Sequence, residues 1–282
     1  MKVQRAFLFI FALSIGISQY SCDIIKGVKK DLNNLIAASD NIVLLEDWTG
    51  HGCGNCPDAH REARTLADFY DSNLVVISIH SGAFASTTLF GPGFETDYTT
   101  TMGTAVDDYF MADQAGFPKG MINRRTFNGK VLQNFADWST YIQQVLSESP
   151  QMGIDITTVY DSVTRNISIT VDLEYFVNGS ASDQIVVCLI EDSIVSPQKD
   201  YDSVPDKLPN YVHRHLLRDA ITTGNWGEAI DAGGISAGDQ FILNFNYTIP
   251  LAFDDKHCAI VAFVADDATK EIRQAAKEEV FE

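Results

Sequence analysis

The chain has 282 residues, of which 45% are hydrophobic, and it carries a formal net charge of −18. That length and hydrophobic content suit two packed domains better than one. The acidic balance argues against nucleic acid as a partner, because such binders need Lys and Arg to displace counterions from phosphates. It argues equally against electrostatic docking on anionic lipid, so the charge mainly indicates solubility.

The first residues, MKVQRAFLFIFALSIGISQYSC, have the form of an export signal. Two basic residues precede an apolar run from Ala6 to Ile17, which is too short to cross a bilayer comfortably. Cys22 lies just beyond this run, where a lipoprotein carries its lipidated cysteine. We therefore expect a signal peptide over residues 1–21, a tether over 22–40 and a lipid anchor at Cys22. Ordinary cleavage after Ser18 is the alternative.

Residues 41–149 alternate between strand and helix patterns. NIVLLEDW and NLVVISIH are short apolar runs typical of strands buried on both faces. Apolar residues at helical spacing lie between them, which predicts a parallel strand pair with a crossover helix. Later, TAVDDYFMADQ predicts a helix, and GFPKGMINRRTFNGKVLQ predicts two strands joined at Asn128-Gly129. A closing helix is expected from Phe135 to Leu146.

Residues 150–282 change to an alternation of period two. Five segments have the pattern of strands separated by turn residues: GIDITTVYD, NISITVDLEYFV, QIVVCLIED, FILNFNYTI and CAIVAFVAD. Such a series is typical of an antiparallel sandwich. The stretch PNYVHRHLLRDAITTGNWGEAI interrupts the series and has room for a short helix.

The segment DWTGHGCGNCPDAH contains the candidate site. Cys53 and Cys56 are separated by two residues and lie at a predicted strand-to-helix junction, where free N–H groups and the helix dipole stabilise a thiolate. Such positions lower a cysteine pKa from about 8.5 into roughly the 3.5–7.5 range. We therefore expect Cys53 to be the exposed attacking sulfur and Cys56 the resolving thiol. In an exported protein, an even number of remaining cysteines also favours disulfide chemistry.

This order of elements resembles the thioredoxin superfamily. The resemblance rests on the strand–CxxC–helix unit, the second buried strand, the later Pro118 ahead of a hairpin, and the closing helix. It implies that Pro118 is a cis-proline facing the cysteine pair, and that Asp47 is a buried carboxylate that helps to deprotonate the resolving cysteine. The intervening Gly54-Asn55 differs from the Gly-Pro of thioredoxins, which leaves the direction of exchange open.

A second resemblance covers nearly all of the chain beyond the signal. LLEDWTGHGCGNCPDAH, GFPKGMINR, IEDSIVSPQ, YVHRHLLRDA and a final IVAFV strand resemble the twenty-eight-kilodalton outer-membrane protein family of Bacteroides-type bacteria. The resemblance implies a location at the outer membrane, a thioredoxin-like domain over residues 41–149 and an immunoglobulin-like β-sandwich over residues 150–282. It implies no particular reaction. The CxxC pair at the strand-to-helix junction, with the later Pro118, predicts thiol–disulfide exchange with envelope protein thiols or disulfides, and no cofactor is expected.

Several alternatives remain open at this point. His51, Cys53, Cys56 and His60 together could bind copper or zinc, or the cysteine pair could be an inert staple in a surface-binding protein. Cys188 and Cys258 could bridge two sheets or remain buried thiols. His213 and His215 could hold a metal from one strand face, or form hydrogen bonds at the domain junction.

Overall fold

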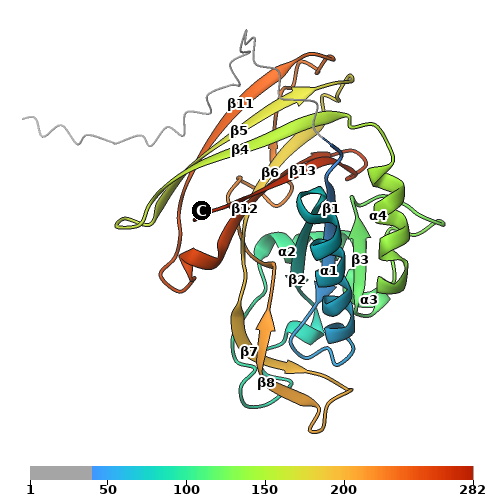
Figure 1. Ribbon diagram of the computed structural model, residues 1–282, viewed down its shortest axis with the longest axis vertical. Coiled ribbons are helices and arrows are strands. Elements are labelled where there is room, and N and C mark those ends of the chain that lie inside the picture. The colour runs from blue at the N-terminus through green and yellow to red at the C-terminus, as the bar shows by residue number, and fades with distance from the viewer. Residues whose placement is uncertain (1–39, 282) are drawn as a thin grey trace, which may run out of the picture.

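The computed structural model describes residues 40–281 and shows a mixed α/β fold (Figure 1). The expected signal peptide, nearly all of the tether and the lipid anchor at Cys22 lie outside the described residues. Within residues 40–281, no helix is long and apolar enough to cross a membrane.

Residues 40–149 form the predicted parallel unit and the helices that cover it. Their elements are β1 (Val43–Thr49), α1 (Cys56–Tyr70), β2 (Leu74–His80), α2 (Thr101–Phe110), α3 (Ala112–Ala115), β3 (Lys119–Ile122) and α4 (Trp138–Leu146). Strands β1 and β2 are parallel with α1 between them in sequence, as predicted. β3 pairs antiparallel with the other side of β1.

The predicted hairpin after Pro118 is confirmed only at its turn. Asn128 and Gly129 both have positive φ values, 50° and 76°, as a two-residue hairpin turn requires. Phe127 and Lys130 exchange backbone hydrogen bonds of 2.8 and 3.0 Å across this turn. The expected second strand is reduced to isolated bridges, one at the turn and one that joins Gly120 to Gln133.

Residues 150–281 contain strands throughout. They are β4 (Met152–Asp161), β5 (Asn166–Tyr175), β6 (Asp183–Glu191), β7 (Ile194–Lys199), β8 (Lys207–His213), β9 (Leu216–Ala220), β10 (Glu228–Ala229), β11 (Gln240–Thr248), β12 (Cys258–Asp266) and β13 (Ile272–Glu279). The five strands predicted from period two correspond to β4, β5, β6, β11 and β12. The stretch with room for a short helix instead supplies β8, β9 and β10, since β9 and β10 pair with β6.

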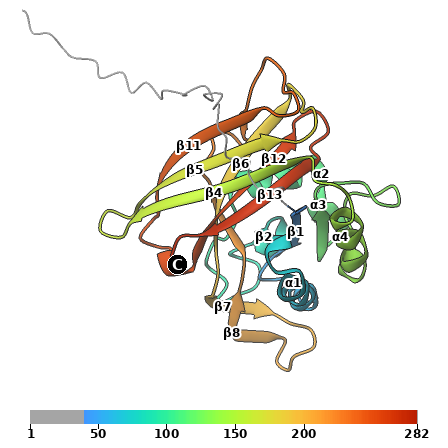
Figure 2. The same cartoon turned by 45° about the horizontal axis from the view of Figure 1, so that its top comes forward.

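One sheet joins the two halves of the chain. Its strand order is β13-β12-β6-β9-β2-β1-β3, with β10 also paired to β6. The halves meet where β2 and β9 run parallel, at Ser78 opposite Leu216, and the Ser78 N–H donates to the His215 carbonyl at 2.7 Å. The second sheet, β11-β5-β4, lies over the β6, β12 and β13 end of this shared sheet (Figure 2).

The shared sheet is buried on both of its faces. Along β6, Ile185, Val187 and Leu189 enter the core beneath the second sheet. Val186 and Ile190 enter the opposite core, which contains α2. A strand covered on both sides has no solvent-facing positions, which explains why QIVVCLI is a continuous apolar run.

Cys188 and Cys258 remain free, so the possible bridge between them is wrong. They lie on the neighbouring strands β6 and β12, but Cys188 is opposite Val261 and Cys258 is opposite Glu191. Their side chains also enter different cores, one on each face of the sheet. Burial raises the pKa of each thiol to about 12, which leaves both unreactive near neutral pH.

The buried guanidinium of Arg124 also contacts both halves of the chain. The guanidinium of Arg124 donates two hydrogen bonds to Glu46 on β1, at 2.8 and 2.6 Å, and both side chains are only 1% exposed. The same guanidinium lies 5.5 Å from the ring centroid of Trp226 and 5.3 Å from that of Phe263, both in the second half. The Arg124 guanidinium therefore connects Glu46 of β1 with two aromatic rings of the second half.

Candidate active site

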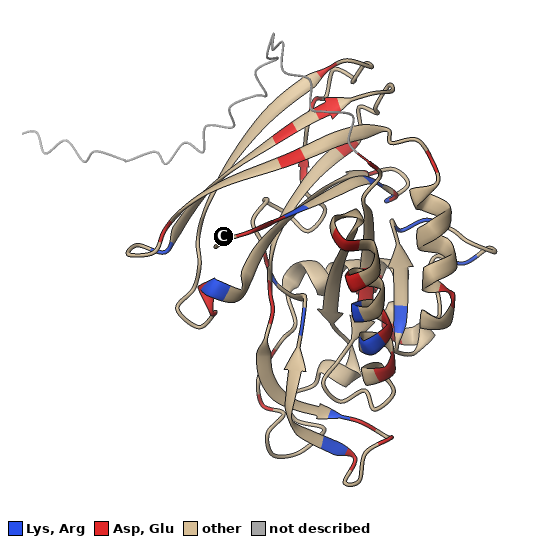
Figure 3. Ribbon diagram, viewed as in Figure 1, with Lys and Arg blue, Asp and Glu red and all other residues tan. Residues whose placement is uncertain are grey.

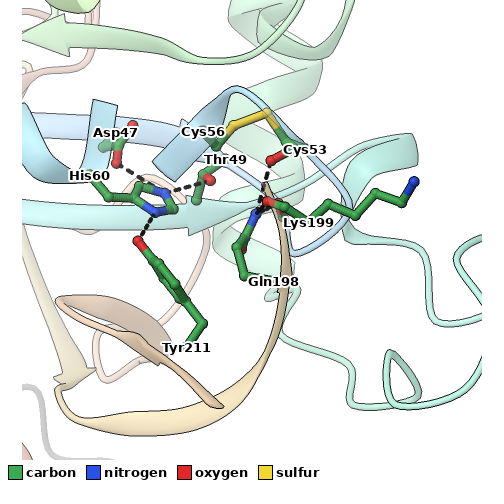
Figure 4. Close-up of a disulfide and its surroundings, with 9 residues drawn as sticks. Asp47, Thr49, Cys53, Cys56, His60, Gln198, Lys199 and Tyr211 are labelled. Carbon is green, nitrogen blue, oxygen red and sulfur yellow. Dashed lines mark hydrogen bonds and ion pairs between the residues drawn. A yellow bond between two sulfur atoms is a disulfide. The ribbon is translucent and has the colours of Figure 1, made fainter. Parts of the chain in front are cut away.

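Cys53 and Cys56 form a disulfide between β1 and α1 (Figure 4). β1 ends at Thr49, a short loop follows, and α1 begins at Cys56 with Pro57 in its first turn. The Cys53 N–H donates to the Gly50 carbonyl at 2.9 Å, and the Cys56 N–H donates to the Cys53 carbonyl at 3.3 Å. The structure therefore places the cysteine pair at the predicted strand-to-helix junction.

The expected exposure of Cys53 is wrong. Cys53 is 2% exposed and Cys56 is fully buried. Two aromatic rings lie against the glycines that flank Cys53. A Cβ atom added to Gly52 would come within 2.0 Å of the Phe90 ring, and one added to Gly54 would come within 2.5 Å of the Tyr201 ring. Only glycine lets both rings approach the loop so closely, and together they help to shield the disulfide from solvent.

The hairpin formed by β7 and β8 supplies most of the polar contacts to this loop. The side-chain amide of Gln198 donates to the carbonyls of Gly50 and Cys53, at 3.2 and 2.9 Å. The backbone N–H of Lys199 donates to His51 at 2.8 Å, and that of Tyr201 donates to Gly54 at 2.9 Å. Four carbonyls of the CxxC loop thus accept hydrogen bonds from one segment that lies almost 150 residues later.

Pro118 lies beside the end of β1 from which this loop leaves. The Phe117–Pro118 peptide bond is cis, as the thioredoxin resemblance implies. Lys119, the next residue, pairs with Trp48 near the end of β1. Phe117 belongs to the same hydrophobic cluster as the two cysteines. The sequence-predicted proline and the disulfide are therefore placed in one region of the fold.

Asp47 is buried beside His60 of α1. Its Oδ2 lies 3.7 Å from His60 Nε2, and neither carboxyl oxygen has a hydrogen bond within the described residues. Burial raises the pKa of Asp47 from 3.8 to about 8, so this carboxyl keeps its proton at neutral pH. Figure 4 shows Asp47 and His60 on the Cys56 side of the disulfide.

His60 connects this carboxyl to the hairpin. Its Nε2 lies 2.8 Å from Thr49 Oγ1, and its Nδ1 lies 2.8 Å from the hydroxyl of Tyr211 on β8. Burial is the main cause that lowers the pKa of His60, to about 3, so the imidazole is neutral. The neutral ring therefore lies between the Thr49 and Tyr211 hydroxyls, beside the protonated carboxyl of Asp47.

The structure does not bring the four possible metal ligands together. Cys53 and Cys56 are joined to each other, and His51 Nε2 lies 3.0 Å from the Ser86 carbonyl. Among residues 40–281, no three His, Cys, Asp or Glu side chains are placed to hold a metal ion. The copper or zinc alternative therefore gains no support from this geometry.

His213 and His215 lie at the junction between the halves, as one of the two alternatives stated. The His213 ring is 5.6 Å from the His80 ring of β2, between centroids. His215 adopts a left-handed backbone conformation with φ of 54°, so the two histidines are not on one regular strand. The His215 N–H donates to Asp192 at 3.0 Å, while its carbonyl accepts from Ser78.

The fold and this site define a mixed α/β protein with a covered disulfide. Residues 104–282, more than half of the chain, match the model of the family described as Outer membrane protein Omp28. The chain therefore belongs to the Omp28 family, and its location is the outer membrane. No protein among curated sequences matches it.

Two solved structures share its fold. HBP35 of Porphyromonas gingivalis is 16% identical, with a TM-score of 0.62, over 85% of this chain and 75% of that one. Protein AGR_C_4864 from Agrobacterium tumefaciens is 14% identical, with a TM-score of 0.53, over 87% of this chain and 97% of that one.

A domain of the outer membrane lipoprotein Omp28 from Porphyromonas gingivalis is 20% identical over 48% of this chain and 91% of that one, with a TM-score of 0.30.

Proposed function

We propose that this outer-membrane protein exchanges thiols and disulfides with envelope proteins through Cys53 and Cys56. The proposal includes a lipid anchor at Cys22, a thioredoxin-like unit over residues 41–149 and an immunoglobulin-like sandwich over residues 150–282. The two units would share one sheet through β2 and β9. The observation that carries the proposal is the Cys53–Cys56 disulfide at the strand-to-helix junction, with a protonated buried carboxyl nearby.

The exchange starts when a partner thiolate attacks Cys53 Sγ. The Cys53–Cys56 bond breaks, a mixed disulfide forms between the partner and Cys53, and Cys56 leaves as a thiolate. Asp47 holds a proton at neutral pH and would supply it to that thiolate, directly or through His60. Pro118, which has no N–H for strand pairing, would border the groove in which the partner docks.

The second step completes the balance of electrons. A second partner thiolate attacks the partner sulfur of the mixed disulfide and releases Cys53 as a thiolate, which takes up a proton from solvent. The partner dithiol has then become a disulfide, and the cysteine pair has been reduced to a dithiol. The reverse direction uses the same steps in the opposite order, with a partner disulfide as the oxidant.

The burial of both cysteines favours a second candidate function. In that alternative the disulfide only fixes the loop on which the β7–β8 hairpin rests, and the protein acts as a binding module at the outer membrane. The two functions differ in one property that is simple to measure. An exchange protein must turn over a thiol substrate, whereas a binding module does not.

Turnover of a peptide with two cysteines, with glutathione disulfide as the terminal oxidant, tests the proposal. We expect wild type to oxidise the peptide and Cys53→Ser to lose this activity. Cys258→Ser is the matched control, because its thiol is free and buried in the other core, beneath the second sheet, and it should retain the wild-type rate. Equal, negligible activity in wild type and Cys53→Ser would remove the exchange function and leave the binding module.

A further inference from the structure

The chain enters and leaves the β7–β8 hairpin at the same end. Its two strands form a sheet of their own, outside the shared sheet. The chain enters beside Ser193 and leaves at His215, which both have left-handed backbone angles, with φ of 61° and 54°. Asp192 joins entry to exit, since it accepts a hydrogen bond from the His215 N–H and lies 3.5 Å from the His215 ring. The hairpin therefore extends from one end, where its entry and exit residues are hydrogen-bonded to each other (Figure 1).

The hairpin is not held by the hydrophobic cores. None of the residues 194–213 belongs to the buried apolar clusters of the described structure. Several of its larger apolar side chains point outward, among them Val195 and Val204. Charged residues of both signs also lie along the hairpin (Figure 3), and Lys199 pairs with Asp206 within it. Segments with so few apolar contacts open at a lower free-energy cost than the core strands do.

Polar contacts beneath the hairpin are incompletely satisfied. Ser196 Oγ and Gln198 Oε1 on β7 are buried without a hydrogen-bond partner in the described residues, and so is His80 Nδ1 on β2 beneath the end of β8. Unpaired buried polar atoms weaken the closed arrangement, because each would gain hydrogen bonds to water on opening. The hairpin contacts are thus specific, but these unpaired atoms lower the free-energy cost of opening the hairpin.

The hairpin occupies the acceptors that border the disulfide. Backbone N–H groups of Lys199 and Tyr201 fill the carbonyls of His51 and Gly54, one on each side of Cys53. The Tyr201 ring lies against Gly54. While these contacts persist, another chain can neither pair with the loop nor bring a thiolate to Cys53 Sγ, which is almost completely buried.

We propose that the β7–β8 hairpin is a hinged cover that controls access to the Cys53–Cys56 disulfide. The inference rests on the proposed function and adds regulation to it. The hairpin lifts about its base between Asp192 and His215, and a partner then reaches Cys53 and the freed carbonyls. Opening also separates Tyr211 from His60, so the cover and the proton path beside Asp47 change together.

The rate at which dithiothreitol reduces the Cys53–Cys56 disulfide tests this proposal. Aliquots are quenched in acid, alkylated and weighed by mass spectrometry. The double substitution Gln198→Ala with Tyr201→Ala removes the two side-chain hydrogen bonds to the CxxC loop and one covering ring, so we expect reduction at least about ten times faster. Val204→Ala is the matched control, since that side chain is fully exposed on the same hairpin, and it should react like wild type.

The outcomes separate the cover from the exchange function. Unchanged reduction in the folded double variant overturns the cover, even if wild type turns over the two-cysteine peptide. Faster reduction without any peptide turnover supports the cover and removes the exchange function.

A second measurement keeps the test decisive if the double variant does not fold. Deuterium exchange of wild type should be faster in residues 194–213 than in β6, and equal protection of the two would overturn the cover.

Discussion

Strand β1 carries two adjacent carboxylates that face opposite sides of the sheet and meet opposite conditions. Glu46 and Asp47 are both buried. Glu46 faces the second half of the chain and accepts two hydrogen bonds from Arg124. Asp47 faces α1, where it has no hydrogen bond and lies 3.7 Å from the neutral His60. Equal burial therefore leaves one carboxylate paired with an arginine and the other protonated at neutral pH.

The difference between Glu46 and Asp47 shows how a candidate functional group can be recognised among buried carboxyl groups. A buried charge is tolerated when a partner neutralises it, as Arg124 does for Glu46. A buried carboxyl without such a partner takes up a proton instead, and the cost of burial appears as a raised pKa. Such perturbed groups are concentrated at functional sites. Of the two, Asp47 is therefore the carboxyl to which the proposed function assigns proton transfer.

The largest effect is expected from the ion pair on the Glu46 side of β1. Arg124→Met leaves Glu46 buried without its partner and should lower the free energy of unfolding by about 3–5 kcal/mol. Urea unfolding followed by circular dichroism measures this loss. Adding Glu46→Leu removes the orphaned charge and should restore most of the stability. A loss of less than about 1 kcal/mol would show that the pair is not structural.

The next effect concerns catalysis on the Asp47 side. Asp47→Asn removes the proton donor, and the rate of peptide oxidation should fall by about 100-fold, the lower end for general acid–base catalysis. Glu46→Gln is the neighbouring control and should leave the rate per folded molecule unchanged. If both substitutions slow the reaction equally, the two faces of β1 do not differ in function.

The pH dependence of stability gives a smaller effect on the same side. Between pH 3.8 and about 8, folded Asp47 keeps a proton that the unfolded chain has lost, so stability should fall as pH rises. Asp47→Asn lacks this dependence. The stability of wild type minus that of the variant should decline by at most about 1.4 kcal/mol per pH unit and level off above pH 8.

The histidines common to both proteins cancel in this difference. Burial lowers the pKa of His60 to about 3, which makes stability rise between that pH and 6.5 in wild type and variant alike. Urea midpoints at a series of pH values provide the measurement. A flat difference between pH 5 and 8 would mean that Asp47 titrates normally.

The smallest effect tests the link from the Asp47 side to the hairpin. Tyr211→Phe removes the hydroxyl that lies 2.8 Å from His60 Nδ1 and should cost about 1 kcal/mol of stability. Because the hairpin loses one contact, reduction of the disulfide by dithiothreitol should also become slightly faster. A stability loss without faster reduction would separate Tyr211 from the cover.

Much of the first half could be predicted from local pattern. NIVLLEDW and NLVVISIH are buried on both faces, so their apolar runs identify β1 and β2 directly. The Asn128-Gly129 turn and the position of Pro118 carry strong local signals. The exposure of Cys53 could not be predicted in this way, because it depends on contacts from Phe90 and Tyr201.

The elements that the sequence did not reveal depend on distant partners. β7 and β8 contain Pro197 and Pro209, which weaken a strand pattern, and much of their contact with the loop is with backbone carbonyls that leave no sequence signature. β13, IRQAAKEE, has the composition of a helix, yet it pairs with β12 along its length. The glycines on either side of Cys53 were the one available sign that another segment approaches closely.

A trapped mixed disulfide would be direct evidence of thiol–disulfide exchange at Cys53. In a Cys56→Ser variant the resolving thiol is absent, so a partner that reacts with Cys53 should remain covalently attached. We predict that a disulfide-containing peptide gives a stable adduct, located at Cys53 by mass spectrometry and released by dithiothreitol. No adduct on the folded variant, even after the hairpin is opened by Gln198→Ala with Tyr201→Ala, would contradict thiol–disulfide exchange at this site.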